Sequence, residues 1–122
     1  MLSVLLLWLV GCQQAESPAA CDQMCASAAA LYGGCLEDWG VDWSAAGYDG
    51  EDGFIGSCET WGWEMSLLQE DAIARGVWEE SGWLSSVCTE RRDALSDEEA
   101  TCAAYTDIEW NDIPWSPDDT GR

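Results

Sequence analysis

The sequence contains no histidine and no lysine, and its four arginines stand against 24 aspartates and glutamates. The formal net charge is −20. A surface this anionic repels phosphate groups, so nucleic-acid binding is excluded. Catalysis by a histidine base, a Cys–His pair or a lysine Schiff base is excluded because the residues are missing, and the same holds for a histidine-liganded zinc.

Carboxylates alone catalyse reactions in glycosidases, so this enzymatic route remains open to the chain. Adjacent acids such as Glu37/Asp38 and Glu79/Glu80 point in different directions on a helix, and 122 residues, one domain at most, leave little room for a substrate cleft. We therefore predict a protein that is not an enzyme.

Long hydrophobic runs are scarce, and the longest lies within MLSVLLLWLVGC at residues 1–12. Its length suits the h-region of a signal peptide and falls short of the ~20 residues that span a bilayer. Its end, Leu9-Val10-Gly11-Cys12, resembles the lipobox of bacterial lipoproteins. The resemblance implies cleavage after Gly11 and a diacylglyceryl group on the Cys12 sulfur. Residues 1–11 are then a signal peptide, and 12–17 are a lipidated cysteine and a short tether.

The same resemblance implies an exported protein that its lipid anchors to a membrane of the cell envelope. Each buried methylene of such a lipid contributes about 0.8 kcal/mol to membrane binding. In some bacterial groups an aspartate directly after the lipidated cysteine favours retention in the inner membrane. Gln13 occupies that position here, which favours the outer membrane.

The cysteine count indicates a disulfide framework. Seven cysteines are present, and lipidation of Cys12 leaves an even set of six, for which fifteen connectivities exist. Zinc binding is disfavoured because only one close cysteine pair occurs. Leu, Ile, Val and Phe together fall below the ~20% that a highly charged folded chain needs, so cross-links are required. We predict that the bonds nest around the turns, as Cys35–Cys58, Cys25–Cys88 and Cys21–Cys102.

Hydrophobic periodicity predicts helices between residues 18 and 106. Ser17-Pro18 has the N-cap and N1 pattern of a helix start. A first stripe with spacings of 4, 3, 4, 3 and 4 consists of Cys21, Cys25, Ala28, Tyr32, Cys35 and Trp39. Gly33-Gly34 should break or kink this helix near its end. A second stripe consists of Cys58, Trp61, Met65, Leu68 and Ala72, and Gly76 should end its helix.

The sequence predicts two further helices. The third covers about residues 79–95, and a short fourth starts at the capping-box sequence Ser96-Asp97-Glu98-Glu99 and carries Cys102 and Tyr105. Residues 107–122 form an acidic, tryptophan-containing tail. The predicted fold is all-α, a small disulfide-stapled bundle of three to four short helices.

The glycine-rich stretch from Gly40 to Gly56 reads as an acidic loop. Its carboxylates include Asp49, Glu51 and Asp52, the residue type that a hard cation such as Ca²⁺ prefers. The spacing fails to match an EF-hand, so a solvated acidic loop stays open beside the possible metal site.

Tryptophan is abundant, with nine residues. Exposed indole rings stack on sugars or anchor protein interfaces, whereas buried ones fill a core that is short of leucine and isoleucine. Trp39 and Trp61 lie on the cysteine-bearing stripes and are expected in the core. Trp43, Trp110 and Trp115 lie in predicted loop or tail and are expected to be exposed for binding.

Charge is distributed unevenly, since no basic residue occurs between Cys12 and Ala74. Such a field attracts basic proteins, although an acidic surface also keeps a tethered domain soluble. We expect a non-enzymatic cell-envelope lipoprotein without a cofactor, with an acidic binding or scaffold domain whose partner is a basic envelope protein. The alternative is a Ca²⁺-binding or glycan-binding surface module.

Overall fold

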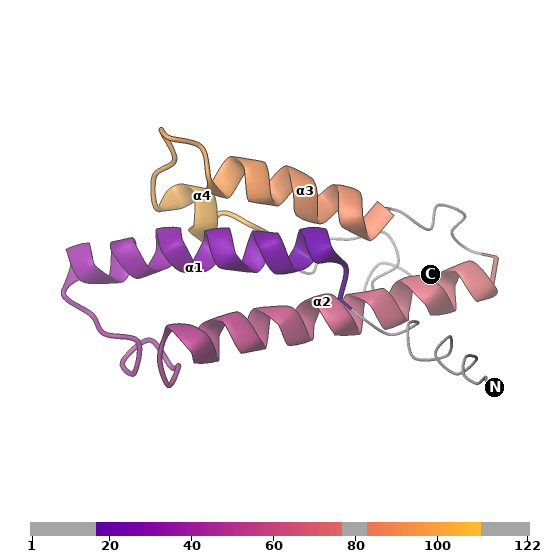
Figure 1. Cartoon of the computed structure of the whole chain (residues 1–122), viewed down its shortest axis with the longest axis horizontal. Helices are drawn as coiled ribbons and strands as arrows, with labels where there is room; N and C mark the ends of the chain where they lie inside the picture. The colour runs from indigo at the N-terminus through magenta and orange to yellow at the C-terminus, as the bar shows by residue number, and fades with distance from the viewer. Residues whose placement is uncertain (1–16, 77–82, 111–122) are drawn as a thin grey trace, which may run out of the picture.

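The computed structural model describes residues 17–76 and 83–110. Its helices are α1 (Ala19–Trp39), α2 (Glu51–Ala74), α3 (Trp83–Leu95) and α4 (Ala103–Thr106). Helix α1 lies between α2 and α3, α2 runs opposite to both, and α4 lies beside α1 and α3 (Figure 1). No strand occurs in these two described ranges. The predicted all-α, disulfide-stapled bundle is confirmed.

Helix α1 begins one residue later than predicted, with Pro18 rather than Ser17 at the N-cap. At its other end Gly40 adopts a φ of 72°, the left-handed conformation that glycine tolerates best. The helix continues through Gly33 and Gly34, where a break or kink was expected. Packing along the whole buried face outweighs the ~1 kcal/mol that each glycine costs.

Helix α2 begins at Glu51, so the predicted acidic loop ends at Gly50 rather than at Gly56. Glu51 and Asp52 lie in the first turn, where unpaired backbone N–H groups stabilise carboxylates. The helix ends at Ala74, and Gly76 follows with a φ of 76°, as its sequence position predicted.

The described part of α3 begins at Trp83, and residues 79–82 of the predicted third helix lie outside the described residues. A buried side chain of α2 bonds to this part of α3, because the Gln69 Oε1 atom accepts a hydrogen bond from the Leu84 N–H at 2.9 Å. The bond joins the two helices through a buried backbone N–H group.

The capping box predicted at residues 96–99 is wrong. The Ser96 hydroxyl donates to the Arg92 carbonyl at 2.8 Å and so closes the end of α3. The Asp97 carboxylate accepts from the Glu99 N–H two residues on, as in an Asx turn. Both side chains therefore stabilise a turn, and α4 starts only at Ala103.

The core consists mainly of small and sulfur-containing side chains. Among the described residues Phe54 is the only buried aromatic one. Ile108 and Trp110, at the start of the predicted tail, also pack against the core. The buried hydrophobic set is Cys21, Met24, Cys25, Ala28, Ala29, Cys35, Leu36, Phe54, Met65, Ala72, Leu84, Cys88 and Leu95.

Three disulfides join α1 to each of the other helical segments. They are Cys21–Cys88 to α3, Cys25–Cys58 to α2 and Cys35–Cys102 to the residue before α4. As predicted, the cysteines one turn apart on α1 bond to other elements rather than to each other. The predicted pairs Cys35–Cys58, Cys25–Cys88 and Cys21–Cys102 are all wrong.

The reason for the different pairing lies in the loop between α1 and α2. Residues 40–50 fold back under α1 before α2 begins (Figure 1). Cys58, in the early part of α2, consequently lies beside Cys25 in the first half of α1, at a Cα–Cα distance of 5.7 Å. Cys35, near the end of α1, remains for Cys102, which follows α3 on that side.

Candidate functional site

The second half of α1 is surrounded by aromatic rings. We call Tyr32, Trp43, Tyr48, Phe54 and Tyr105 the aromatic cluster. Tyr32 stacks on Tyr105 with ring centroids 4.5 Å apart, and Phe54 lies 5.1 to 5.9 Å from the other four. These rings come from α1, the 40–50 loop, α2 and α4, so the cluster joins these four segments.

Gly33 provides the surface on which Trp43 lies. A Cβ atom at Gly33 would come within 3.1 Å of the Trp43 ring, whereas one at Gly34 would meet nothing within 4 Å. The 40–50 loop is closed by a hydrogen bond from the Tyr48 N–H to the Trp43 carbonyl at 2.9 Å. Gly33, which was expected to weaken the helix, therefore allows the Trp43 indole ring to pack directly against the α1 backbone.

A second aromatic group lies between α2 and α3. Trp61 and Trp110 meet edge to face, with centroids 5.6 Å apart. The Arg91 guanidinium lies 5.7 Å from the Trp61 ring centre and 5.4 Å from that of Trp110, within range of a cation–π interaction. Arg91 also donates to the Glu109 carbonyl at 3.0 Å, which fixes the chain after α4 against α3.

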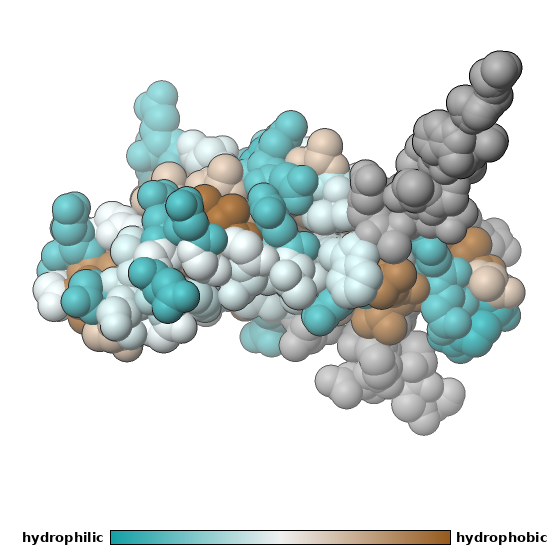
Figure 2. All heavy atoms as spheres, turned by 60° about the horizontal axis from the view of Figure 1, so that its bottom comes forward, coloured by the Kyte–Doolittle hydropathy of each residue, from teal (hydrophilic) through white to brown (hydrophobic). Residues whose placement is uncertain are grey.

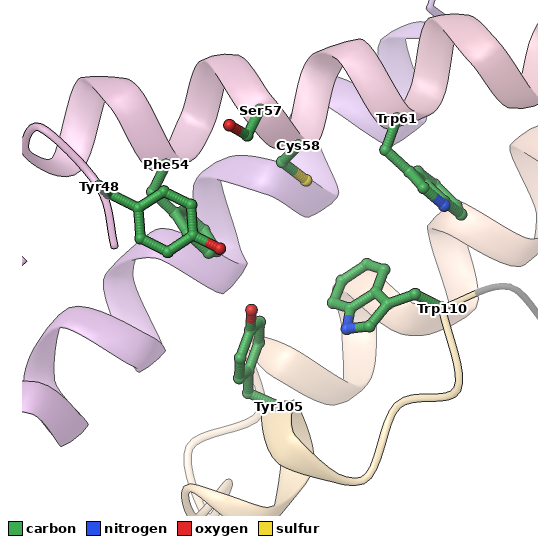
Figure 3. Close-up of a pocket in the computed structure, with 7 residues that line it drawn as sticks. All are labelled: Tyr48, Phe54, Ser57, Cys58, Trp61, Tyr105 and Trp110. Atoms are coloured by element: carbon green, nitrogen blue, oxygen red, sulfur yellow. The ribbon is translucent and has the colours of Figure 1, made fainter. Parts of the chain in front are cut away.

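A pocket of about 180 Å³ remains between these two groups. Most of its walls are aromatic, and no charged side chain lines it. In Figure 3 the hydroxyl of Tyr105 points from α4 into this space, and the rings of Trp61 and Trp110 close its far end. Its lining residues are Tyr48, Phe54, Ser57, Cys58, Trp61, Tyr105 and Trp110.

Burial, followed by the neighbouring Tyr48 and Tyr32, raises the pKa of Tyr105 to about 12. A tyrosine with the ordinary pKa of 10.0 is already neutral at physiological pH, and the raised pKa keeps the Tyr105 hydroxyl a donor and acceptor further into the alkaline range.

The proposed metal ligands do not form a site. No group of three carboxylates or cysteines suited to a metal ion occurs within residues 17–76 and 83–110. Asp49, Glu51 and Asp52 are each exposed, and the last two belong to the first turn of α2. Glu51 and Asp52 thus stabilise the start of that helix.

The tryptophans are placed almost opposite to expectation. Trp39, expected in the core, is 52% exposed, and Trp61 is half-buried. Trp43 and Trp110, expected to be exposed, are half-buried and packed against the core. Trp115 lies outside the described residues. Trp43 and Trp110 were predicted to be exposed because they lie outside the helices, but the segments that carry them pack onto the helices.

The surface is anionic throughout the described ranges. Each Asp and Glu there is exposed except Asp22, which is half-buried. Figure 2 shows hydrophilic side chains projecting over the α2 side, with hydrophobic residues confined to separate patches. The arginines of the described ranges bond to groups of the same chain: Arg75 pairs with Asp71, and Arg92 bonds to Asp93 and Gln23.

No protein-family model, curated protein or solved structure matches the chain. Within the described residues no helix is both long and apolar enough to cross a bilayer. Two features of the described residues bear on function, the aromatic-lined pocket and the acidic surface.

Proposed function

We propose that the protein is a non-enzymatic lipoprotein of the cell envelope whose acidic domain binds a basic envelope protein. The observation that carries the proposal is the exposure of the carboxylates while Arg75, Arg91 and Arg92 are held by groups of the same chain. The outward field is therefore negative in most directions, which favours the approach of cationic partners.

The anchor in this proposal is the lipid on Cys12, with the outer membrane as its location. Four residues separate Cys12 from Ser17, and a fully extended chain over that length spans about 18 Å. The lipid would then keep the start of α1 close to the headgroups. Labelled palmitate should be incorporated by the natural protein and not by Cys12→Ala, and an unlabelled natural protein would contradict the anchor.

The partner can be tested by carbodiimide cross-linking in intact envelopes, because this reagent joins carboxylates to amines. The chain has no lysine, so any cross-link from its carboxylates to a lysine must join it to another molecule. We expect such links to a lysine-rich envelope protein. They should fade as salt shortens the screening length from about 10 Å at 0.1 M to about 3 Å at 1 M.

Two results would contradict binding through charge. One is the absence of lysine cross-links at low salt, and the other is a yield that does not change with salt. The alternative Ca²⁺ site has no cluster of ligands in the described residues, so we do not propose it.

A further inference from the structure

We propose that the aromatic pocket holds one uncharged aromatic side chain of the partner, and that basic residues flank this side chain in the partner's sequence. The inference rests on the proposed function and adds to it a recognition element. The chemistry recognised is a phenyl-sized ring within a cationic peptide.

The size of the pocket fits a single ring. Its volume is about 180 Å³, and an apolar cavity of ~150 Å³ is sufficient to hold benzene. Phe54, Trp61, Tyr105 and Trp110 contribute rings from several sides, so an inserted ring would find edge-to-face and offset partners within the usual 4.5–7 Å.

The lining disfavours a sugar. A sugar needs several convergent polar groups, whereas the polar side chains at this pocket are one serine and two tyrosines. Of these hydroxyls, that of Tyr105 points into the space enclosed by the rings (Figure 3). Burying a sugar here would leave most of its hydroxyls without partners.

The lining also disfavours a cationic group inside the pocket. Aromatic walls attract cations, but Arg91 already lies 5.7 and 5.4 Å from the ring centres of Trp61 and Trp110. A second positive charge on these rings would be repelled by the guanidinium. The inserted group is therefore uncharged.

Positive charge on either side of the inserted ring is favoured by the acidic surface of the protein. Asp49, Glu59, Asp107 and Glu109 are all exposed, and each lies within two residues in the sequence of a residue that lines the pocket. The carboxylates attract a cationic peptide, and the pocket anchors its central ring.

The test uses three synthetic nonapeptides and the full-length protein with its disulfides intact. The first peptide has a central phenylalanine flanked by lysines and arginines, the second has alanine at the centre, and the third has the phenylalanine flanked by glutamates. Calorimetry at low salt should show the first binding on the order of ten- to a hundredfold more tightly than the second. The third should not bind.

A matched pair of variants locates the binding. Ser57→Trp places a large ring at the pocket and should abolish the advantage of phenylalanine over alanine. Thr60→Trp, on an exposed position of the same helix that does not line the pocket, should preserve it. Both positions are exposed, and circular dichroism checks that the helices are retained. The peptide comparison on the natural protein needs no variant.

Several outcomes would overturn the proposal. Equal binding of the phenylalanine and alanine peptides would refute the pocket and leave charge-driven binding intact. Equal binding of the basic and acidic phenylalanine peptides would refute the basic flanks. Displacement of the first peptide by tetramethylammonium or an oligosaccharide would show a different ligand chemistry. Binding seen only in Trp115→Ala would identify the chain's own C-terminal segment as the occupant.

Discussion

The two halves of α1 are packed in different ways. Around its first half the disulfides Cys21–Cys88 and Cys25–Cys58 join it to α3 and α2, and Gly62 of α2 lies so close that a Cβ there would overlap the Ser17 Oγ atom and come within 3.3 Å of the Cys21 Cβ. Around its second half the neighbours are the rings of the aromatic cluster. The buried cysteines and alanines of the first half leave no exposed surface, whereas most of the rings stay half-buried.

The difference teaches how a short, leucine-poor chain builds both a core and a binding surface. Small side chains and disulfides allow helices to approach closely and interlock. Large rigid rings meet at steep angles and leave space between them, and here that space is the pocket. This contrast between the cysteine-rich first half and the aromatic second half can be tested by substitution and denaturation.

The largest effect should come from the disulfides. Full reduction should abolish the helical circular-dichroism signal. Cys21–Cys88 and Cys35–Cys102 both have a sequence separation of 67, so the chain-entropy model assigns each about 4 kcal/mol. Replacing both cysteines of a bond by alanine should cost about 1 kcal/mol more for Cys21–Cys88, because both of its residues are fully buried and truncation leaves a cavity.

Urea denaturation of the two double variants gives the free energies of unfolding to compare. Cys102 is half-buried, and its neighbours can close around an alanine more easily. An equal loss of stability in both variants would show that the two halves of α1 do not differ in packing.

The next largest loss of stability should come from substitution of Arg91, which lies on α3 and contacts the rings of Trp61 and Trp110. Arg91→Ala removes the contacts with the two indole rings and the hydrogen bond to the Glu109 carbonyl. We expect a loss of about 1–2 kcal/mol in unfolding free energy and a change in tryptophan fluorescence. Arg75→Ala is the control, since it breaks only an exposed pair with Asp71 and should cost below about 0.5 kcal/mol. Equal losses would mean that the ring contacts contribute nothing.

A smaller effect separates two adjacent glycines of α1. Gly34→Ala should stabilise the protein by about 0.5–1 kcal/mol, because its Cβ meets open space in a helix. Gly33→Ala should lose that gain, because its Cβ presses on Trp43 at 3.1 Å, and the emission of that indole should shift. Thermal unfolding measures both variants. A Gly33→Ala protein as stable as Gly34→Ala would show that Trp43 is loosely held.

The ionisation of Tyr105 should have the smallest effect on stability at neutral pH. Its pKa is raised to about 12 in the folded protein against 10.0 for the free side chain. Below pH 10 both states keep the proton, so stability does not depend on this group. Between pH 10 and 12 the unfolded chain loses the proton while the folded one retains it, so stability falls as pH rises.

The alkaline fall should be measured by urea denaturation in steps from pH 9 to pH 12. Tyr105→Phe should show a shallower fall, because the ionisable group is absent. The same slope in both proteins would place Tyr105 in a solvent-like environment, contrary to a closely packed aromatic half.

The helices were predictable because their apolar stripes follow the helical period. The stripe from Cys21 to Trp39 predicted the extent of α1, and Gly76 predicted the end of α2. The stripe wrongly predicted that Trp39, its last member, would be buried. Trp39 lies in the final turn of α1, and about half of its surface is exposed. Periodicity gives the direction of a side chain, and burial depends also on which segments lie above it.

The pairing of the cysteines and the candidate site could not be predicted in the same way. Both depend on the path of residues 40–50, because this loop sets the position of α2 relative to α1 and supplies Trp43 and Tyr48. A run of glycines and carboxylates resembles a solvated loop. Its two rings, placed among those glycines, are the signal that would have suggested a segment folded onto the helices.

The connectivity of the disulfides has a consequence for survival among proteases. Every bond has one cysteine in α1 and the other in a different segment. Cleavage of the backbone within 40–50, 77–82 and 96–101 would therefore leave three separate fragments, each still covalently attached to α1. A nicked molecule would therefore remain in one piece, and under the proposed lipid anchor at Cys12 every fragment would stay attached to the membrane through α1.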